Sequence, residues 1–118
     1  MNTKSPECYT TDLQARGLRV EISASRSLLL PFDQFVFAEL NSEDKEQKLL
    51  LVFATHEVLI SGHALRRIES AMHRMELASI VPVPAKYQTL MGENQPRILE
   101  IVVTENKSVH LEPQAALN

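Results

Sequence analysis

The sequence predicts a β-rich α+β domain, in which a curved and mostly antiparallel sheet or small barrel of about five to six strands packs against one helix. Several segments alternate apolar and polar residues with the period of two that is typical of strands. In the run Leu49 to Ala54, the odd and the even positions are both apolar. This indicates a central strand that is covered on both faces. Beyond Gly62 the apolar period changes to that of a helix. A chain of 118 residues is long enough for one hydrophobic core.

The expected strands follow this pattern in order. Residues 18–22 alternate apolar and charged side chains and predict the first strand. Pro31 cannot donate to a ladder, so it should lie at a break or at a sheet edge. Residues 34–40 and 48–54 are expected to pair, because the polar segment between them is typical of a hairpin loop. Residues 98–104 alternate again and predict the last strand.

One amphipathic helix is expected from about Ala64 to Ala78. Before it, Val58 to Ile60 resumes the apolar run, either as the strand of a second hairpin or as part of one bulged strand. Ser61 is a candidate N-cap because its hydroxyl can accept from the first-turn amides, and Gly62 is the alternative. The helix should stop before Pro82. Its apolar stripe recurs at spacings of three, four and three, at Leu65, Ile68, Met72 and Met75.

The two ends of the chain differ in composition from the middle. Residues 1–17 mix polar and charged side chains with few apolar anchors, so we expect a flexible N-terminal arm. Residues 18–104 are expected to form the single α+β domain. Residues 105–118 are polar, and we expect them to form a flexible C-terminal tail.

Composition and charge narrow the classes of function. The formal net charge of −3 argues against nucleic-acid binding through a generally basic surface, since phosphate contacts need clustered Lys and Arg. The longest nearly apolar stretch is far shorter than the ~20 residues that span a bilayer, and we expect no signal peptide. The single Cys8 cannot form an intramolecular disulfide, which favours a reducing compartment. We therefore expect a cytoplasmic protein without a membrane partner.

The sequence contains none of the common catalytic or nucleotide-binding motifs. There is no GxSxG nucleophile elbow, and the three glycines are too scattered for a GxGxxG or Walker motif. The four histidines do not have the spacings of short metal-binding motifs; they are His56, His63, His73 and His110. We therefore expect no catalytic residue, no cofactor and no metal site, and the sequence favours a protein that is not an enzyme.

The first functional hypothesis is a non-catalytic interaction or regulatory module that self-associates through its sheet. One helix covers only one face of a sheet, whereas the run Leu49 to Ala54 needs cover on both. Either the sheet closes into a barrel, or its second face is buried against a copy of the same chain. An open sheet with a dimer interface is thus the alternative fold. The expected partner is a homodimer or higher homo-oligomer, with an unidentified protein as the alternative.

Two further hypotheses rest on polar side chains. One is nucleic-acid binding through the basic side of the helix, which carries Arg66, Arg67 and Arg74. Glutamates interleave with these arginines, which favours an ordinary solvated helix face over a nucleic-acid interface. The other is a small-molecule or enzymatic pocket at the mouth of a barrel, lined by His56, Glu57 and His63.

A short motif lies in Val58 to Glu69, which reads VLISGHALRRIE. It resembles the second short motif of Sm-like RNA-binding proteins, in which two strands meet around an apolar-Arg-Gly turn. The positions that match are Ile60, Gly62, Leu65 and Ile68, and Ser61 stands where that family has its arginine. The resemblance implies RNA binding, and it motivates the hypothesis that the basic side of the helix contacts RNA.

Overall fold

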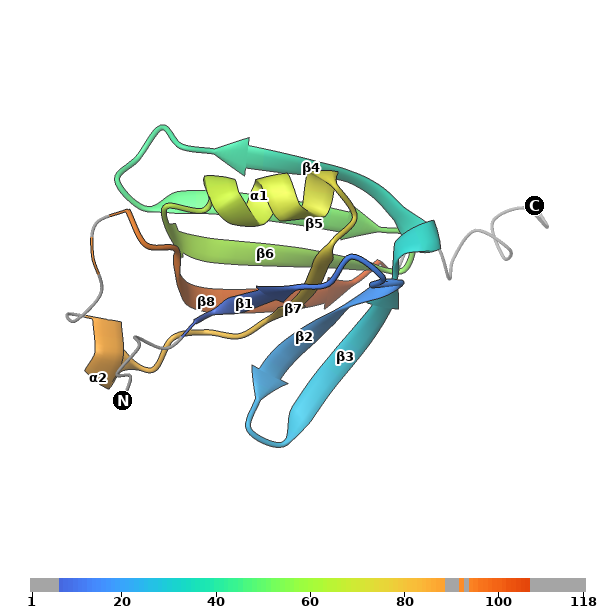
Figure 1. Ribbon diagram of the computed structural model, residues 1–118, viewed down its shortest axis with the longest axis horizontal. Coiled ribbons are helices and arrows are strands. Elements are labelled where there is room, and N and C mark those ends of the chain that lie inside the picture. The colour runs from blue at the N-terminus through green and yellow to red at the C-terminus, as the bar shows by residue number, and fades with distance from the viewer. Residues whose placement is uncertain (1–6, 89–91, 93, 107–118) are drawn as a thin grey trace, which may run out of the picture.

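The computed structural model describes residues 7–88, 92 and 94–106, and in these residues eight strands form two four-stranded sheets (Figure 1). Sheet A has the order β1-β7-β2-β3, with β1 at Tyr9–Thr11, β7 at Leu77–Ile80, β2 at Gly17–Ser23 and β3 at Arg26–Pro31. Sheet B has the order β4-β5-β6-β8, with β4 at Phe35–Asn41, β5 at Gln47–Phe53, β6 at His56–His63 and β8 at Arg97–Glu105. The predicted β-rich α+β class is confirmed, with more strands than expected.

Sheet B is antiparallel throughout, and it contains most of the strands that the sequence predicts. The β4–β5 hairpin pairs Leu40 with Leu49 and Ala38 with Leu51, as expected from the polar loop between the two segments. β6 pairs with β5 on one side and with β8 on the other. Strands β4 and β8 remain the two edges of sheet B, so the sheet does not close into a barrel.

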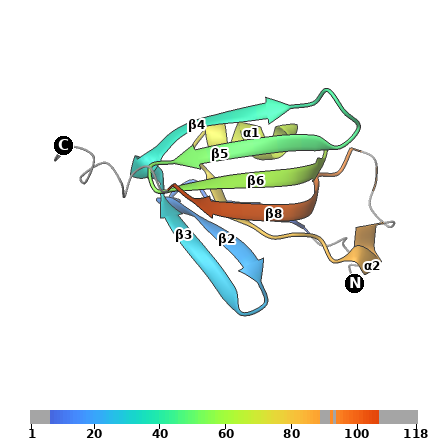
Figure 2. The same ribbon diagram turned by 180° about the vertical axis from the view of Figure 1, so that it is seen from behind.

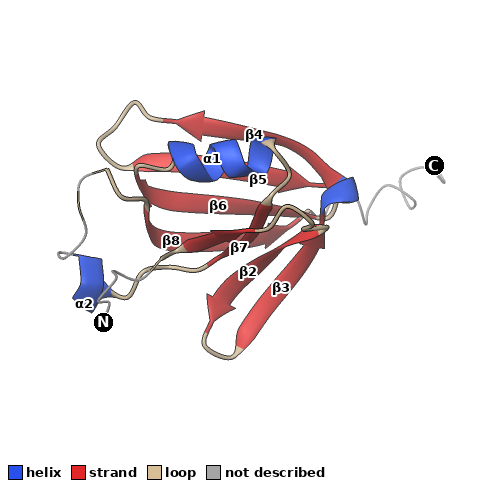
Figure 3. Ribbon diagram, in the orientation of Figure 1, coloured by secondary structure: helices blue, strands red, loops and turns tan. Residues whose placement is uncertain are grey.

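Helix α1 (Arg66–His73) and strands β1 and β7 of sheet A lie side by side over one face of sheet B, so the molecule has two layers, and the β2–β3 hairpin extends past the β8 edge (Figure 3). A short 3-10 helix, η1 (Phe32–Gln34), connects β3 to β4, and a one-turn helix, α2 (Ala85–Gln88), follows β7. Pro31 is the last residue of β3, at the edge of sheet A, where its missing amide costs no ladder bond.

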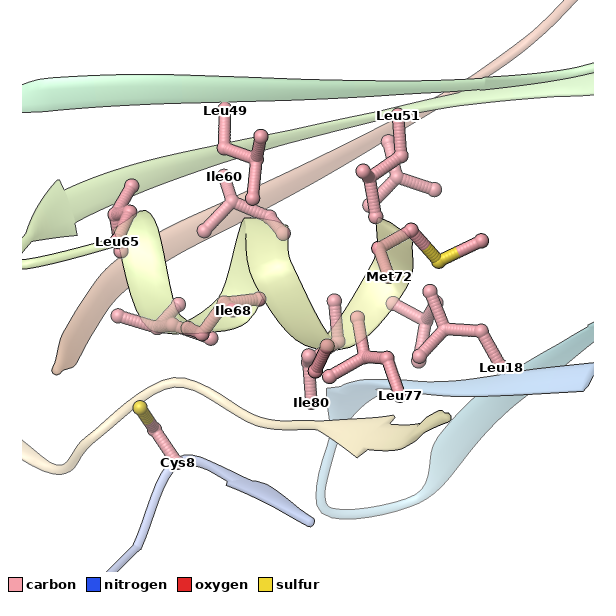
Figure 4. Packing of buried hydrophobic residues seen from close by; sticks show 14 of the residues in the cluster. Cys8, Leu18, Leu49, Leu51, Ile60, Leu65, Ile68, Met72, Leu77 and Ile80 are labelled. Carbon is pink, nitrogen blue, oxygen red and sulfur yellow. The ribbon is translucent and has the colours of Figure 1, made fainter. Parts of the chain in front are cut away.

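The core fills the space between the two layers (Figure 4). Sheet B contributes side chains of alternating residues, and α1 contributes the side that faces them. Met72 of α1 packs near Leu51 of sheet B and Leu18 of sheet A, so it joins all three elements. The fully buried side chains include Leu18, Leu49, Leu51, Phe53, Ile60, Leu65, Ile68, Met72, Leu77, Ile80 and Ile98.

The predicted helix exists, but it is shorter at both ends than residues 64–78. It ends at His73 because Met75 takes a positive φ of 57°, and the Met75 and Glu76 amides donate to carbonyls of the last turn. The chain then turns into β7. Met75 is 41% exposed, so its assignment to the buried stripe was wrong. Ser61 is not the N-cap, because it lies in β6 and its hydroxyl accepts from the Lys48 ammonium group at 3.1 Å.

Residues 7–17, which we expected within a flexible arm, include β1. The strand is held because Cys8 is 1% exposed in the core, and because its carbonyl accepts from the Val81 amide at 2.9 Å. Thr10 pairs with Ser79, and their hydroxyls are 2.6 Å apart. Residues 1–6 of the expected arm, and residues 107–118 of the expected tail, lie outside the described residues.

The segment that resembles the Sm-like motif does not form two strands around a turn. Gly62 lies within β6, and the residues from Arg66 onward form α1. Gly62 is required there by packing, since a Cβ on it would overlap the carbonyl oxygen of Arg97 on β8. A bulge between Ser61 and Gly62 shifts the register against β8 at the same place. No helix among the described residues has the length and apolar character needed to cross a bilayer.

Candidate functional site

The face of sheet B that points away from α1 and sheet A carries apolar side chains on all four strands. We call it the outer face, and its apolar residues are Phe37, Leu50, Val52, Leu59 and Val102. Phe37 is 48% exposed and Val102 is 43% exposed, and the other three are half-buried. Seen from behind, β4, β5 and β6 run across the surface with no other described element over them (Figure 2). This is an apolar surface that the described part of the chain leaves uncovered.

The strand register gathers these residues into adjacent cross-strand rows. Leu50 pairs with Leu59, and Leu59 pairs with Val102, so one row is apolar on three neighbouring strands. In the next row Phe37 pairs with Val52. Directly opposed apolar side chains on one face of a sheet are in contact range. The five residues therefore form one continuous patch.

Polar residues lie at both ends of this patch. Lys48 pairs with Ser61 at one end, and its ammonium group is 3.2 Å from the Glu46 carboxylate. Glu57 pairs with Val52 at the opposite end. The Lys48 end is of mixed charge, because Ser61 also pairs with Glu100, whereas Glu57 places a carboxylate in the same row as Phe37 and Val52.

The arginines singled out in the sequence all lie on or just after α1, and they line two hollows that share Arg74. Arg66 is 3.4 Å from the Glu69 carboxylate, and its side chain is 73% exposed. Arg67 and Arg74 line a groove of about 610 Å³ between α1 and β1, together with Tyr9, Thr10 and Thr11. The Nε of Arg74 donates to the Glu76 carboxylate at 3.1 Å. Arg66 and Arg74 line the second hollow, together with Glu69, Ser70 and His73, so Arg74 lies beside each of the other two predicted arginines.

The residues proposed for a pocket do not meet. His56 and His63 are the first and last residues of β6, which places them about 23 Å apart at 3.3 Å per residue. Glu57 follows His56 and pairs with Thr104 on the outer face. The His56 ring nitrogen Nδ1 is 2.8 Å from the Thr55 hydroxyl. No barrel mouth exists for them to line, because sheet B is open.

Cys8 is the one thiol of the chain, and it is buried beside the groove. Its Sγ donates to the Pro96 carbonyl at 3.4 Å. Burial raises the pKa of the Cys8 thiol, because a thiolate would lose its hydration there. A thiol that stays protonated is a weak nucleophile.

Within the residues that the structure describes, no group of three or more His, Cys, Asp or Glu side chains is arranged to hold a metal ion. His110 lies outside those residues. Comparison with known proteins gives no match either, whether to a family model, to a curated protein or to a solved structure.

Sequence reasoning found part of the outer face and missed the rest. Leu50 and Val52 belong to the run Leu49 to Ala54, whose apolar residues on both faces were the signal for a face in need of cover, and Leu59 belongs to Val58 to Ile60, which was expected to resume that run. Phe37 and Val102 could be assigned to the same patch only from the register with which β4 and β8 pair with their neighbours. The groove was missed because its β1 wall lies in the segment assigned to a flexible arm.

Proposed function

We propose that this protein is a non-catalytic interaction module that self-associates through the outer face of sheet B. The observation that carries the proposal is the continuous apolar patch formed by Phe37, Leu50, Val52, Leu59 and Val102. Contiguous apolar surface of this kind, rimmed by polar residues, is typical of interaction sites. A second copy of the chain offers a face of the same chemistry, and two sheets pack face to face about 10 Å apart through such side chains.

The size of the face favours a reversible dimer. Four strands spaced about 4.8 Å apart, each with seven residues at about 3.3 Å per residue, cover roughly 440 Å² in projection. Stable interfaces bury about 600–1,000 Å² per partner, so the projected area of this face is below the range of stable interfaces. We therefore expect self-association in the micromolar range or weaker.

The positions of Lys48 and Glu57 favour one arrangement of the dimer. A twofold axis parallel to the sheet and perpendicular to its strands superimposes each end of the face on the opposite end of the other copy. In that arrangement Lys48 of each copy lies over the end that carries Glu57 of the other. The apolar row through Leu50, Leu59 and Val102 then packs against itself.

Sedimentation velocity from micromolar to millimolar concentration tests the proposal. We expect the weight-average mass to rise toward that of a dimer, and Val102→Glu to shift the rise to at least tenfold higher concentration. Leu29→Glu is the matched control, because Leu29 is 60% exposed on β3, away from the outer face. A monomer at every concentration, or an equal effect of the two substitutions, would contradict the proposal.

A charge exchange tests the orientation of the two copies. Lys48→Glu alone should weaken the dimer, because it faces the Glu57 end of the second copy with a like charge. Adding Glu57→Lys should restore the affinity. If the double variant stays as weak as Lys48→Glu, the twofold axis across the strands is wrong, even if the outer face is the interface.

A further inference from the structure

The groove between α1 and β1 lies on the opposite side of the molecule from the outer face (Figures 1 and 2). Its volume of about 610 Å³ is within the ~300–1,000 Å³ usual for ligand sites. One wall is strand β1, from Tyr9 to Thr11, and the other is the side of the helix that carries Arg67 and Arg74. The chemistry of the two walls identifies what the groove can bind.

The β1 wall is an open strand edge. β1 is the terminal strand of sheet A and pairs only with β7. The Cys8 carbonyl accepts from Val81 and Thr10 is opposite Ser79, so the backbone groups of these two residues point toward β7. In an antiparallel ladder the residues between them point the other way. A register shift follows Thr10, but the Asp12 amide again donates toward this partner segment, to the Glu76 carbonyl at 2.9 Å. The amides and carbonyls of Tyr9 and Thr11 therefore point away from β7, as donors and acceptors on two residues that line the groove.

The helix wall is cationic. Arg67 makes no hydrogen bond or ion pair with any of the described residues, and Arg74 uses only its Nε, toward Glu76. The two residues are seven positions apart, which is about 10.5 Å along a helix. Three residues of an extended strand cover nearly the same length, about 10 Å. Glu7 also lines the groove and Glu76 pairs with Arg74, so Arg67 is the cation of this wall that has no ion-pair partner among the described residues.

We propose that this groove binds an extended acidic peptide, which adds as a strand to the open edge of β1. The peptide backbone pairs with the amides and carbonyls of Tyr9 and Thr11, and its carboxylates accept hydrogen bonds from Arg67 and Arg74. Strand addition of this type takes affinity from main-chain hydrogen bonds and specificity from side-chain contacts. Guanidinium and carboxylate groups match in geometry as well as in charge.

A peptide fits the groove better than a nucleic acid does. Alternating backbone donors and acceptors match another polypeptide, whereas phosphates accept hydrogen bonds and would leave the strand carbonyls unpaired. Bases also need exposed aromatic side chains for stacking. Tyr9 is the one aromatic residue in the lining, and it is half-buried against the core.

The test uses the full chain, labelled with ¹⁵N, and a pool of seven-residue peptides with glutamate fixed at the third and fifth positions. Carboxylates two residues apart project from the same side of a strand, about 6.6 Å from each other, so the long Arg67 and Arg74 side chains must converge to reach both. We expect the amide signals of Tyr9 and Thr11 to shift on titration, and the affinity to fall as salt is added. No shift at millimolar peptide would overturn the proposal. So would shifts of the same size with glutamine in place of both glutamates.

Two controls separate strand addition from simple charge attraction. Arg67→Ala should weaken binding about tenfold, because a charge-assisted hydrogen bond is lost. Arg66→Ala is the matched control, since Arg66 lies on the same helix but outside the groove lining. N-methylation of the peptide amide that faces β1 should weaken binding at least as much, whereas N-methylation of the next amide should not. The proposal would be overturned if Arg67→Ala and Arg66→Ala weakened binding equally, or if the two N-methylated peptides bound equally well.

Other occupants of the groove give different results. A single-stranded oligonucleotide that displaces the peptide and binds more tightly would replace the proposal with nucleic-acid binding. If deletion of residues 1–6, rather than addition of peptide, shifts Tyr9 and Thr11, the chain's own N-terminal segment is the occupant. Because α1 and β1 lie on the side of sheet B opposite to the outer face, peptide binding by Val102→Glu, at a concentration where sedimentation shows a monomer, tests the groove independently of self-association.

Discussion

Replacing Gly62 with alanine should destabilise the fold, because the new methyl group has no room. Its Cβ would overlap the Arg97 carbonyl oxygen and lie 3.0 Å from the carbonyl carbon of the same residue. Both atoms belong to the backbone of β8, so the strand itself must move. Gly62 pairs with Ile98, and the shift would disturb the ladder that places Val102 on the outer face.

Three contributions set the expected change in the free energy of unfolding on replacing Gly62 with alanine. Overpacking costs about 1–3 kcal/mol, and weakening one β6–β8 hydrogen bond costs about 1 kcal/mol. Lower entropy of the unfolded chain offsets about 0.4–1 kcal/mol. We expect the free energy of unfolding to fall by about 1.5–3 kcal/mol. The entropy of unfolding for a chain of this length is about 0.25 kcal/mol/K, so the melting temperature should fall by about 6–12 °C.

Urea and thermal denaturation measure the change, and two other glycines provide a graded comparison. A Cβ on Gly17 would lie 2.8 Å from the Leu30 carbonyl oxygen, which predicts a smaller loss. A Cβ on Gly92 meets no described atom within 4 Å, so Gly92→Ala should leave stability unchanged or raise it slightly. The reasoning fails if Gly62→Ala is as stable as Gly92→Ala.

Three further predictions concern the helix end, the thiol and the sheet. Met75→Gly should raise the free energy of unfolding by about 0.5–1 kcal/mol in urea, because glycine takes the positive φ at this position without strain; a loss would refute this account. The pKa of Cys8 is raised on folding, so the folded state holds its proton longer, and stability should fall as pH rises above the unfolded thiol pKa of about 8.5. Cys8→Ala should remove that part of the pH dependence, measured by denaturation at pH 7 and pH 10. Leu51→Ala should cost about 2–5 kcal/mol, whereas Leu50→Ala should cost clearly less in the monomer and weaken self-association; equal losses would mean that the outer face is not exposed as described.

The predictions from sequence were best where a pattern is local. The β4–β5 hairpin followed from a polar loop between two apolar segments, and its register agrees with the expected pairing. The helix followed from the change of period after Gly62, although its end at His73 did not. That end depends on the left-handed backbone of Met75, a residue type that gives no sign of such a conformation.

The pairing of segments that lie far apart in the chain could not be predicted from local sequence patterns. β1 exists because it pairs with β7, almost seventy residues later, and because Cys8 reaches the core. Its three residues are too short for a period to identify them. The groove depends on that pairing, so neither its open edge nor the convergence of Arg67 and Arg74 on it could be predicted.

The sequence by itself determined that the strand from Leu49 has two apolar faces and that one helix cannot cover both. Successive side chains of a strand point to opposite faces, so the sequence of the strand alone shows which faces avoid water, before any partner is known. Only the tertiary structure decided which elements cover each face of this strand. α1 and sheet A together cover the inner face, and the outer face stays open because sheet B does not close. Closure depends on contacts between β4 and β8, which lie far apart in the chain, and no local pattern specifies them.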